Sequence, residues 1–182
     1  MRRRLLIGLV LLAVCGCAPD TITSDWQRVE PPVAAADFAL RRIDGGTVSL
    51  TDYRGRVVIL EFWATWCGPC RFSLPSLEVI YNKYRSRGVA VLLVNCGEPA
   101  DRVRAWAERR FTAPILLDEG AAVAERYGVA SLPRLFIINQ AGQMIYRHAG
   151  YGGGLEHNLT RMLEDLLRTP SDAAHAQVTI AK

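Results

Sequence analysis

Two cysteines separated by two residues lie in the segment EFWATWCGPC, residues 61–70. A Cys-x-x-Cys pair can exchange electrons through a disulfide, supply half of a tetrahedral metal site, or crosslink the chain permanently. Cys67 stands where an apolar run gives way to a helical pattern, and a helix N-terminus there would favour its thiolate. We therefore expect Cys67 to attack a substrate disulfide and Cys70, one helical turn later, to act as the resolving thiol.

The two other uses of the pair fit the sequence poorly. A zinc site needs a second pair of ligands, but His148, His157 and His175 are scattered without ligand spacing. A permanent crosslink around so short a loop would add little stability. We expect no metal ion and no cofactor other than the redox-active cysteine pair.

Glu61 is an acid within the apolar run VVILEFWA, six residues before Cys67. A carboxyl group inside a buried strand costs free energy unless it is paired or functional. Burial would raise its pKa, and the group could then accept the proton of Cys70 during resolution. The alternative is an edge carboxylate that faces solvent. We predict the proton-accepting role, in which Glu61→Gln slows turnover without preventing folding.

The N-terminus has the pattern of an export signal. The basic cluster MRRR, the apolar run LLIGLVLLAV and the small residues around CGC follow one another. The stretch VCGC resembles a bacterial lipobox, which predicts cleavage before Cys17 and its acylation; a plain signal peptide or a short uncleaved anchor are the alternatives. Each places the folded part at the periplasmic or other extracytoplasmic face of a membrane.

Composition indicates one globular domain. The chain has 182 residues, of which 50% are hydrophobic and 22% charged. Its formal net charge is +4, but the MRRR cluster supplies three of these charges, so nucleic-acid binding has no electrostatic support. We expect a signal peptide at 1–16, a lipid-anchored linker at 17–36, the domain at 37–168 and a disordered tail at 169–182.

The hydrophobic pattern predicts strands that alternate with helices. FALRRI and TVSL flank a DGG turn and indicate an opening hairpin, and VVILEFWA and VAVLLVNC indicate two buried strands. Cys96 ends the second of these, where we expect a buried small hydrophobe; the alternative is a third redox thiol. Between the two strands we predict a helix that ends at Gly88, with Phe72 on its apolar side and a kink at Pro75.

The rest of the pattern continues the alternation. We predict helices in ADRVRAWAERR and EGAAVAERYG, a short strand in PILL, a hairpin from RLFIIN and QMIYRHAG, and a last helix over 155–167. Strands that alternate with helices and end in a hairpin imply an α/β fold, with a mixed sheet and helices on both faces.

These motifs together resemble the thioredoxin superfamily, specifically its extracytoplasmic TlpA/ResA branch. FWATWCGPC resembles the active-site segment, and DGGTVSLTDYRGR, NCGE, PILLDEGAAVAERYGV and SLPRLFIINQAG have counterparts in that branch. The resemblance runs from about Phe38 to Leu167. It implies a thioredoxin-like three-layer sandwich with an N-terminal β-hairpin extension, and the activity of a protein thiol-disulfide oxidoreductase.

The resemblance also implies roles around the cysteines. Pro133, after Leu132, matches the cis-proline that faces the disulfide and exposes backbone for pairing with an extended substrate. Trp66, together with Gly68 and Pro69, would border the substrate surface. Trp63 matches a second flanking aromatic, for which we favour simple core packing.

Glu61 and Glu98 are two acids with counterpart positions in the family pattern. Glu61 stands where thioredoxin has a buried aspartate, whereas many TlpA-like proteins carry a neutral residue there. Glu98, in NCGE, matches an acid near the active-site cavity and would tune the cysteines or recognise a partner. The alternative for Glu98 is a carboxylate at a helix N-terminus.

The Gly-Pro spacer between the cysteines matches reducing thioredoxins, and a proline offers no N–H to stabilise the thiolate further. We therefore expect a reductase of protein disulfides, and we expect the chain to be monomeric. The family resemblance implies that a membrane thiol-electron donor supplies the electrons, with apocytochrome c as the leading family example of a substrate. A disulfide oxidase or isomerase is the alternative. A peroxidase would need Pro-x-x-x-Thr-x-x-Cys, which WATWCGPC lacks, and a copper-binding lipoprotein module would need a ligand set that the histidines do not make.

Overall fold

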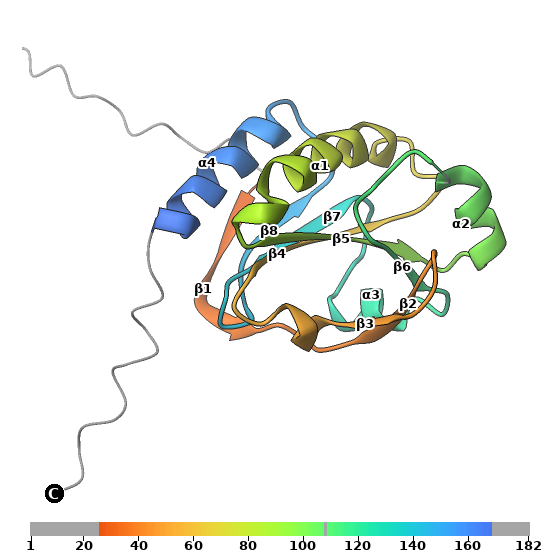
Figure 1. The fold of residues 1–182 in the computed structure, drawn as a ribbon, viewed down its shortest axis with the longest axis horizontal. Helices are drawn as coiled ribbons and strands as arrows, with labels where there is room; N and C mark the ends of the chain where they lie inside the picture. Colours follow the sequence, from red (N-terminus) through yellow and green to blue (C-terminus); the bar gives the residue numbers. More distant parts are fainter. Residues whose placement is uncertain (1–25, 108, 169–182) are drawn as a thin grey trace, which may run out of the picture.

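Eight strands form one sheet in a computed structural model that describes residues 26–107 and 109–168. The strand order is β1-β8-β7-β4-β5-β6-β2-β3 (Figure 1). The strands are β1 (Trp26–Ala34), β2 (Ala39–Arg42), β3 (Thr47–Ser49), β4 (Val57–Trp63), β5 (Val89–Cys96), β6 (Ile115–Asp118), β7 (Arg134–Ile138) and β8 (Gln143–Ala149).

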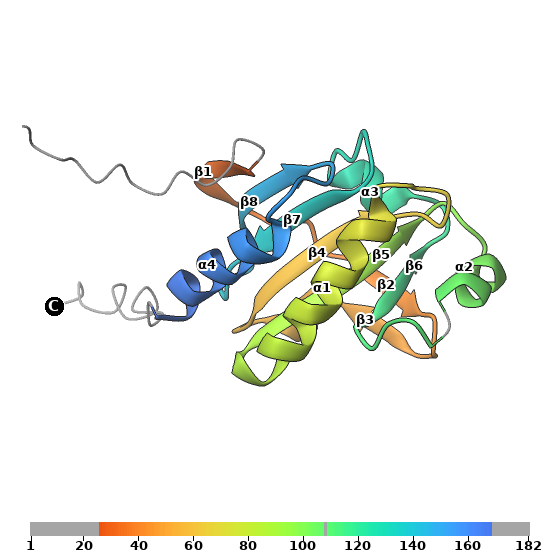
Figure 2. The same ribbon diagram turned by 90° about the horizontal axis from the view of Figure 1, so that it is seen from above.

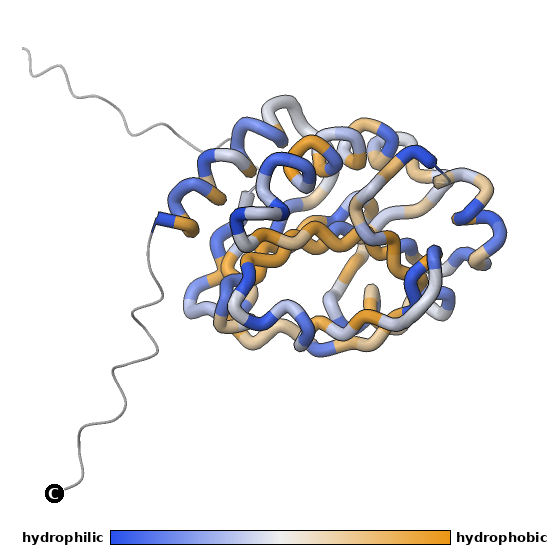
Figure 3. Tube along the Cα trace, in the orientation of Figure 1, coloured by the Kyte–Doolittle hydropathy of each residue, from blue (hydrophilic) through white to orange (hydrophobic). Residues whose placement is uncertain are grey.

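The central strand β4 positions the active site. All seven of its residues are buried, as expected for an apolar run covered on both faces. It pairs parallel with β5 and antiparallel with β7, while β5 pairs parallel with β6, so the sheet is mixed. In Figure 3 the hydrophobic colour is concentrated along these central strands, and hydrophilic colour is concentrated on the helices around them.

Helices cover both faces of the sheet. The helices are α1 (Cys70–Tyr84), α2 (Ala100–Ala107), α3 (Ala122–Arg126) and α4 (Leu155–Arg168). One core cluster joins α1, α2 and α4 to one face, and a second joins α3 and the 3-10 turn at 50–53 to the other. Figures 1 and 2 show α1 and α4 side by side over the sheet. The predicted α/β sandwich, with a mixed sheet and helices on both faces, is confirmed.

Helix α1 lies where the sequence predicts a helix, but it ends at Tyr84 and a 3-10 turn at 85–87 leads on to Gly88. Pro75 lies inside the helix, and Gly88 ends the 3-10 turn with a left-handed φ of 81°. Phe72 was expected on the apolar side with residues such as Leu77, but its ring is 64% exposed. Cys70, Ser73 and Leu74 lie on the buried side of this part of the helix, and Phe72 lies on the opposite, solvent-facing side.

The predicted linker needs a correction. The described part of 17–36 contains strand β1, which pairs antiparallel with β8 from Trp26 opposite His148 to Ala34 opposite Gln143. Most of its residues are exposed, so the segment lacks the apolar alternation that predicts a strand; backbone pairing with β8 creates it.

Three sequence predictions fall outside the described residues: the signal peptide at 1–16, acylation of Cys17 and the tail at 169–182. Among the helices of the described part, none has the length and hydrophobicity needed to cross a membrane.

Candidate active site

Cys67 and Cys70 form a disulfide in the turn between β4 and α1, with their Cα atoms 5.3 Å apart. Cys70 is fully buried at the start of α1, whereas Cys67 retains 4% exposure between the exposed residues Trp66 and Gly68. The Cys70 backbone N–H donates to the Cys67 Sγ at 3.2 Å. Cys67 is therefore the sulfur that a substrate can approach, and a backbone donor stabilises negative charge on it.

Three exposed aromatic side chains lie close to the disulfide. Trp66 and Phe72 are near the cysteines in the chain, and Tyr151 contacts Phe72. Trp66 is 68% exposed, and Phe72 stacks on Tyr151 with ring centroids 5.9 Å apart. Among the described residues, only Val33 and Val79 are further large hydrophobic side chains with comparable exposure. Exposed aromatic side chains of this kind are typical of surfaces that bind another protein.

Pro133 lies at the same end of the sheet as the disulfide. The peptide bond between Leu132 and Pro133 is cis, the isomer that the family resemblance implies. Strand β7 starts at the next residue, with Arg134 opposite Phe62 of β4, so Pro133 is level with the last residue of β4. Its carbonyl accepts the backbone N–H of Gly150 at 2.9 Å.

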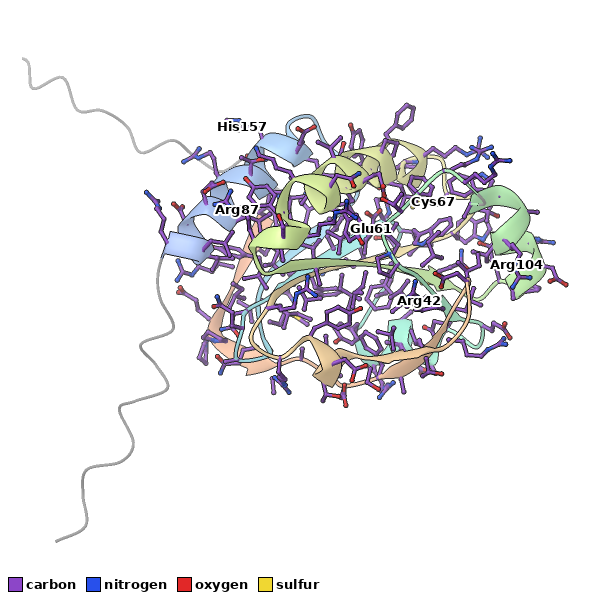
Figure 4. The ribbon with its side chains drawn as sticks, viewed as in Figure 1. Arg42, Glu61, Cys67, Arg87, Arg104 and His157 are labelled. Atoms are coloured by element: carbon purple, nitrogen blue, oxygen red, sulfur yellow. A yellow bond between two sulfur atoms is a disulfide. The ribbon has the colours of Figure 1, made fainter. Side chains whose placement is uncertain are left out.

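Glu61 lies on β4 and is fully buried between the sheet and α1 (Figure 4). The alternative of a solvent-facing edge carboxylate is excluded by this burial. The Ser73 hydroxyl is 2.5 Å from Glu61 Oε1, while Oε2 has no hydrogen-bond partner among the described residues. Burial raises the pKa of Glu61 to about 8, and the Ser73 hydrogen bond offsets part of that rise.

Ser73 connects Glu61 to the start of α1, and the sequence analysis did not identify it. Its Oγ is 2.5 Å from Glu61 Oε1 and 3.2 Å from the carbonyl oxygen of Cys70. The hydroxyl has one proton, so it donates to only one of these acceptors at a time. When Glu61 is protonated it can donate to Ser73, and Ser73 can then donate to Cys70. Its position three residues after Cys70 is the sequence signal that could have found it.

Glu98 lies in the loop between β5 and α2 and is also buried. Its Oε2 accepts the Thr65 backbone N–H at 2.7 Å and the Asn95 amide at 2.8 Å, and its Oε1 accepts the Thr65 hydroxyl at 2.6 Å. These donors hold its pKa below the usual value against the opposing effect of burial. Glu98 therefore fixes the segment that leads to Cys67, two residues after Thr65.

The remaining predicted residues lie around this centre. Trp63 is fully buried and packs on Trp106 with ring centroids 5.1 Å apart, as expected for core packing. Cys96 is partly buried and forms no disulfide, and burial raises the pKa of its thiol to about 12. A thiol with that pKa is a poor nucleophile near neutral pH.

The described residues contain no group of three or more His, Cys, Asp or Glu side chains that could hold a metal ion. The chemistry that this arrangement can perform is dithiol–disulfide exchange at Cys67 and Cys70, with Glu61 as a buried acid next to the helix that carries Cys70.

Known proteins are similar to this chain in sequence and in fold. The sequence pattern of the AhpC/TSA family matches residues 32–147. The thiol-disulfide oxidoreductase ResA of Geobacillus thermodenitrificans is 40% identical over 146 residues, which cover 78% of this chain and 82% of the relative. The protein of the same name from Bacillus subtilis is 30% identical over 150 residues, covering 79% and 84%.

Solved structures of thiol-disulfide proteins are also similar to this chain in fold. A putative thiol:disulfide interchange protein DsbE from Chlorobium tepidum superposes with a TM-score of 0.69 and 32% identity, covering 75% of this chain and 96% of that one. The exposed lipoprotein thioredoxin of Streptococcus pneumoniae superposes with a TM-score of 0.64 and 33% identity, covering 72% and 100%.

Proposed function

The chain belongs to the AhpC/TSA family and is a thiol-disulfide oxidoreductase of the thioredoxin-like kind, and from this premise we propose that it reduces protein disulfides outside the cytoplasm. The observation that carries the proposal is the arrangement of Cys67, Cys70 and Glu61: an accessible sulfur, a buried sulfur and a buried acid of raised pKa.

The reaction consumes one dithiol and one substrate disulfide. The Cys67 thiolate attacks a substrate sulfur, the substrate S–S bond breaks, and the first substrate thiolate leaves and takes up a proton. Cys70 then loses its proton and attacks the Cys67 sulfur. The Cys67–Cys70 disulfide forms, the mixed disulfide breaks and the second substrate thiol is released. Two electrons pass from the enzyme to the substrate.

Glu61 is the proton acceptor for Cys70 in this proposal. Its hydrogen-bond partner Ser73 also lies within hydrogen-bond distance of the Cys70 carbonyl, which supports coupling between the carboxyl and the start of α1. Its pKa of about 8 lies much nearer to that of a thiol than an ordinary carboxylate pKa does, so proton transfer from a thiol to Glu61 costs less free energy than transfer to an exposed acid.

The substrate is proposed to bind at the exposed surface around the disulfide. An extended substrate segment pairs with the backbone beside the cis-proline, at Leu132 and Pro133, and its side chains contact Trp66. Gly68 and Pro69 are exposed between the cysteines, so they lie where the substrate backbone must approach. Glu98 is a positioning residue in this proposal, because it accepts hydrogen bonds from Thr65 in the active-site turn and from Asn95 near the end of β5.

The proposed direction of electron flow rests on the Gly-Pro spacer and the buried acid. An apocytochrome c with oxidised haem-binding cysteines is the proposed example of a substrate, in cytochrome c maturation, and a membrane thiol-electron donor would regenerate the dithiol. Export and a lipid anchor at Cys17 are proposed from the sequence of residues 1–17.

Trapping the mixed disulfide tests the roles of the cysteines. With Cys70→Ser, attack by Cys67 cannot be resolved, so a covalent enzyme–substrate complex accumulates on non-reducing gels. With Cys67→Ser none forms. Accumulation with the Cys67→Ser variant instead would reverse the assignment.

The reduction potential of the pair tests the direction. We expect a value close to that of thioredoxin, about −270 mV, and catalysis of insulin reduction. A value near about −120 mV, typical of a dedicated oxidant, would overturn the reductase proposal in favour of the oxidase or isomerase alternative. Peroxide consumption without insulin reduction would favour a peroxidase.

A further inference from the structure

A surface pocket of about 440 Å³ lies next to the active-site helix, on the side facing α2. One wall comes from α1 residues Arg71, Pro75 and Glu78, at positions i, i+4 and i+7, so one stripe of the helix lines it. The other wall comes from the end of α2 and the segment after it. That wall consists of Trp106, Arg110 and Phe111.

The pocket adjoins the redox centre. Arg71 directly follows the resolving cysteine Cys70, so the pocket begins within one turn of the disulfide. Its aromatic wall is fixed to the same region, because Trp106 packs on Trp63, the last residue of β4 before the active-site turn. A substrate whose disulfide is at Cys67 can therefore also place a group in this pocket.

Cationic and aromatic groups dominate the lining. The Arg110 guanidinium stacks over the Trp106 ring at 5.1 Å, and Trp106 stacks on Phe111 with centroids 6.0 Å apart. Neither Arg71 nor Arg110 forms an ion pair with another residue of the described part of the chain. Guanidinium groups beside aromatic rings are well suited to bind carboxylates, because they present paired donors next to a surface of low polarity.

Glu78 is the one acid in the lining, and its carboxylate is already occupied. It accepts the backbone N–H groups of Thr112 at 2.9 Å and Ala113 at 3.1 Å, together with the Thr112 hydroxyl. These donors lower its pKa, so it stays charged and anchors the segment after α2. It holds the wall in place and leaves both arginines available for a ligand.

We propose that this pocket docks an acidic segment of the disulfide-bearing protein substrate, with Arg71 and Arg110 binding carboxylates close to the reactive cysteine. The proposal rests on the reductase function above and names a class of substrate for it: proteins with Asp or Glu within a few residues of the disulfide. The two arginines favour an acidic segment over a basic one by charge complementarity. The aromatic wall favours a polypeptide segment in which apolar residues lie beside the acidic ones.

Matched peptides test the proposal. Three synthetic peptides of equal length, each closed by the same disulfide loop, carry two Asp, two Asn or two Lys residues beside one cysteine. The measured quantity is kcat/KM for their reduction by the dithiol enzyme, divided by the rate with dithiothreitol alone, since flanking charge alters the intrinsic reactivity of a disulfide.

We expect the normalised kcat/KM to be about fivefold higher for the Asp peptide than for the Asn peptide, as for two partly exposed ion pairs, and lowest for the Lys peptide. In the double variant Arg71→Gln/Arg110→Gln the Asp/Asn ratio falls to about one. Arg85→Gln removes the same charge at the far end of α1 and keeps the ratio of the wild type. At about 1 M salt the preference shrinks, because exposed ion pairs are screened.

Three results would overturn the proposal. Equal normalised rates for the three peptides in the wild type would remove the docking role and leave the reductase function intact, whereas failure to reduce any of them would remove both. Binding to vesicles of anionic lipid that is lost in the double variant, without a preference among peptides, would assign the pocket to a membrane surface instead.

Discussion

Two buried carboxylates flank the active-site turn, and the protein holds them in opposite ways. Glu61 comes from the middle of β4 and has one hydrogen-bond partner, Ser73. Glu98 comes from the loop after β5 and has three donors, two from Thr65 and one from Asn95. Deep burial raises the pKa of Glu61, and its one hydrogen bond offsets only part of that rise. Glu98 lies nearer the surface, so its desolvation is outweighed by its three donors and by the charge of Arg102, and its pKa is lowered.

The comparison shows that depth of burial, the number of donors and nearby charge together decide what a buried acid can do. Three donors stabilise the charged form of Glu98 so strongly that it remains an anion and acts as a fixed anchor. One donor leaves Glu61 close to the balance between its two forms, so it can gain and lose a proton near neutral pH. Four predictions test this contrast, from the largest expected effect to the smallest.

The first prediction concerns stability and pH at Glu61. The folded-state pKa of about 8 lies above the unfolded value of 4.5, so the folded chain keeps a proton that the unfolded chain has released. The contribution of Glu61 to stability is complete below pH 4.5 and is lost as the pH rises towards 8, at about 1.4 kcal/mol per pH unit. Between pH 5 and 8 the free energy of unfolding should fall by up to about 4 kcal/mol more in the wild type than in Glu61→Gln. Urea unfolding at several pH values measures it, and parallel curves would contradict it.

The second prediction concerns Glu98, which anchors the active-site turn. Glu98→Ala leaves the donors of Thr65 and Asn95 without their acceptor and should lower the free energy of unfolding by about 3 kcal/mol. Glu98→Gln keeps one acceptor oxygen and should lose about half as much. Chemical denaturation of the oxidised protein at pH 7 gives both values. A loss below about 1 kcal/mol for the alanine variant would show that the loop is held by other contacts.

The third prediction concerns the rate of resolution. Glu61→Gln cannot accept a proton, so release of the substrate thiol from the mixed disulfide should slow about 100-fold at pH 7, corresponding to about 2.7 kcal/mol. Rapid mixing of the reduced variant with a disulfide substrate follows the step. Glu98→Gln keeps Glu61 and should retain the pH dependence of the wild type. An unchanged rate across the pH range in Glu61→Gln would remove the proton-accepting role.

The fourth prediction concerns the hydroxyl that bonds to Glu61. The Ser73 hydrogen bond lowers the pKa of Glu61, so Ser73→Ala should raise that pKa further, by a shift worth about 1 kcal/mol. The pH profile of resolution should move to higher pH by less than one unit. Ser76→Ala removes an exposed hydroxyl from the same helix and provides the control. A profile that moves equally in both variants would assign the effect to the helix and not to Glu61.

Much of this site could be predicted from local sequence. The buried run that ends at Trp63, the turn that carries Cys67 and the helix that begins at Cys70 each have their own signal, and the Gly-Pro spacer lies between the cysteines. The acid at Glu61 was evident because a charged residue is unexpected in a buried strand. Such features depend on neighbours within a few positions.

Other features depend on residues far apart in the sequence. The donors from Thr65 to Glu98 are separated by 33 positions, so the choice between anchor, tuning group and helix N-terminal carboxylate required the fold. Phe72 has helical spacing but faces solvent, where it meets Tyr151 from the segment after β8. Strand β1 lacks a hydrophobic period and exists only because β8 offers it a partner.

The pairing of β1 with β8 also limits association between copies of this chain. The hydrogen-bonding groups along one side of β8 would otherwise form an open sheet edge, which another chain could extend by adding a strand. Strand β1 covers that edge and becomes the outermost strand itself, where Pro31 and Pro32 offer no backbone N–H to a further strand. A chain shortened to begin at residue 35 should therefore self-associate more than the intact chain in size-exclusion chromatography.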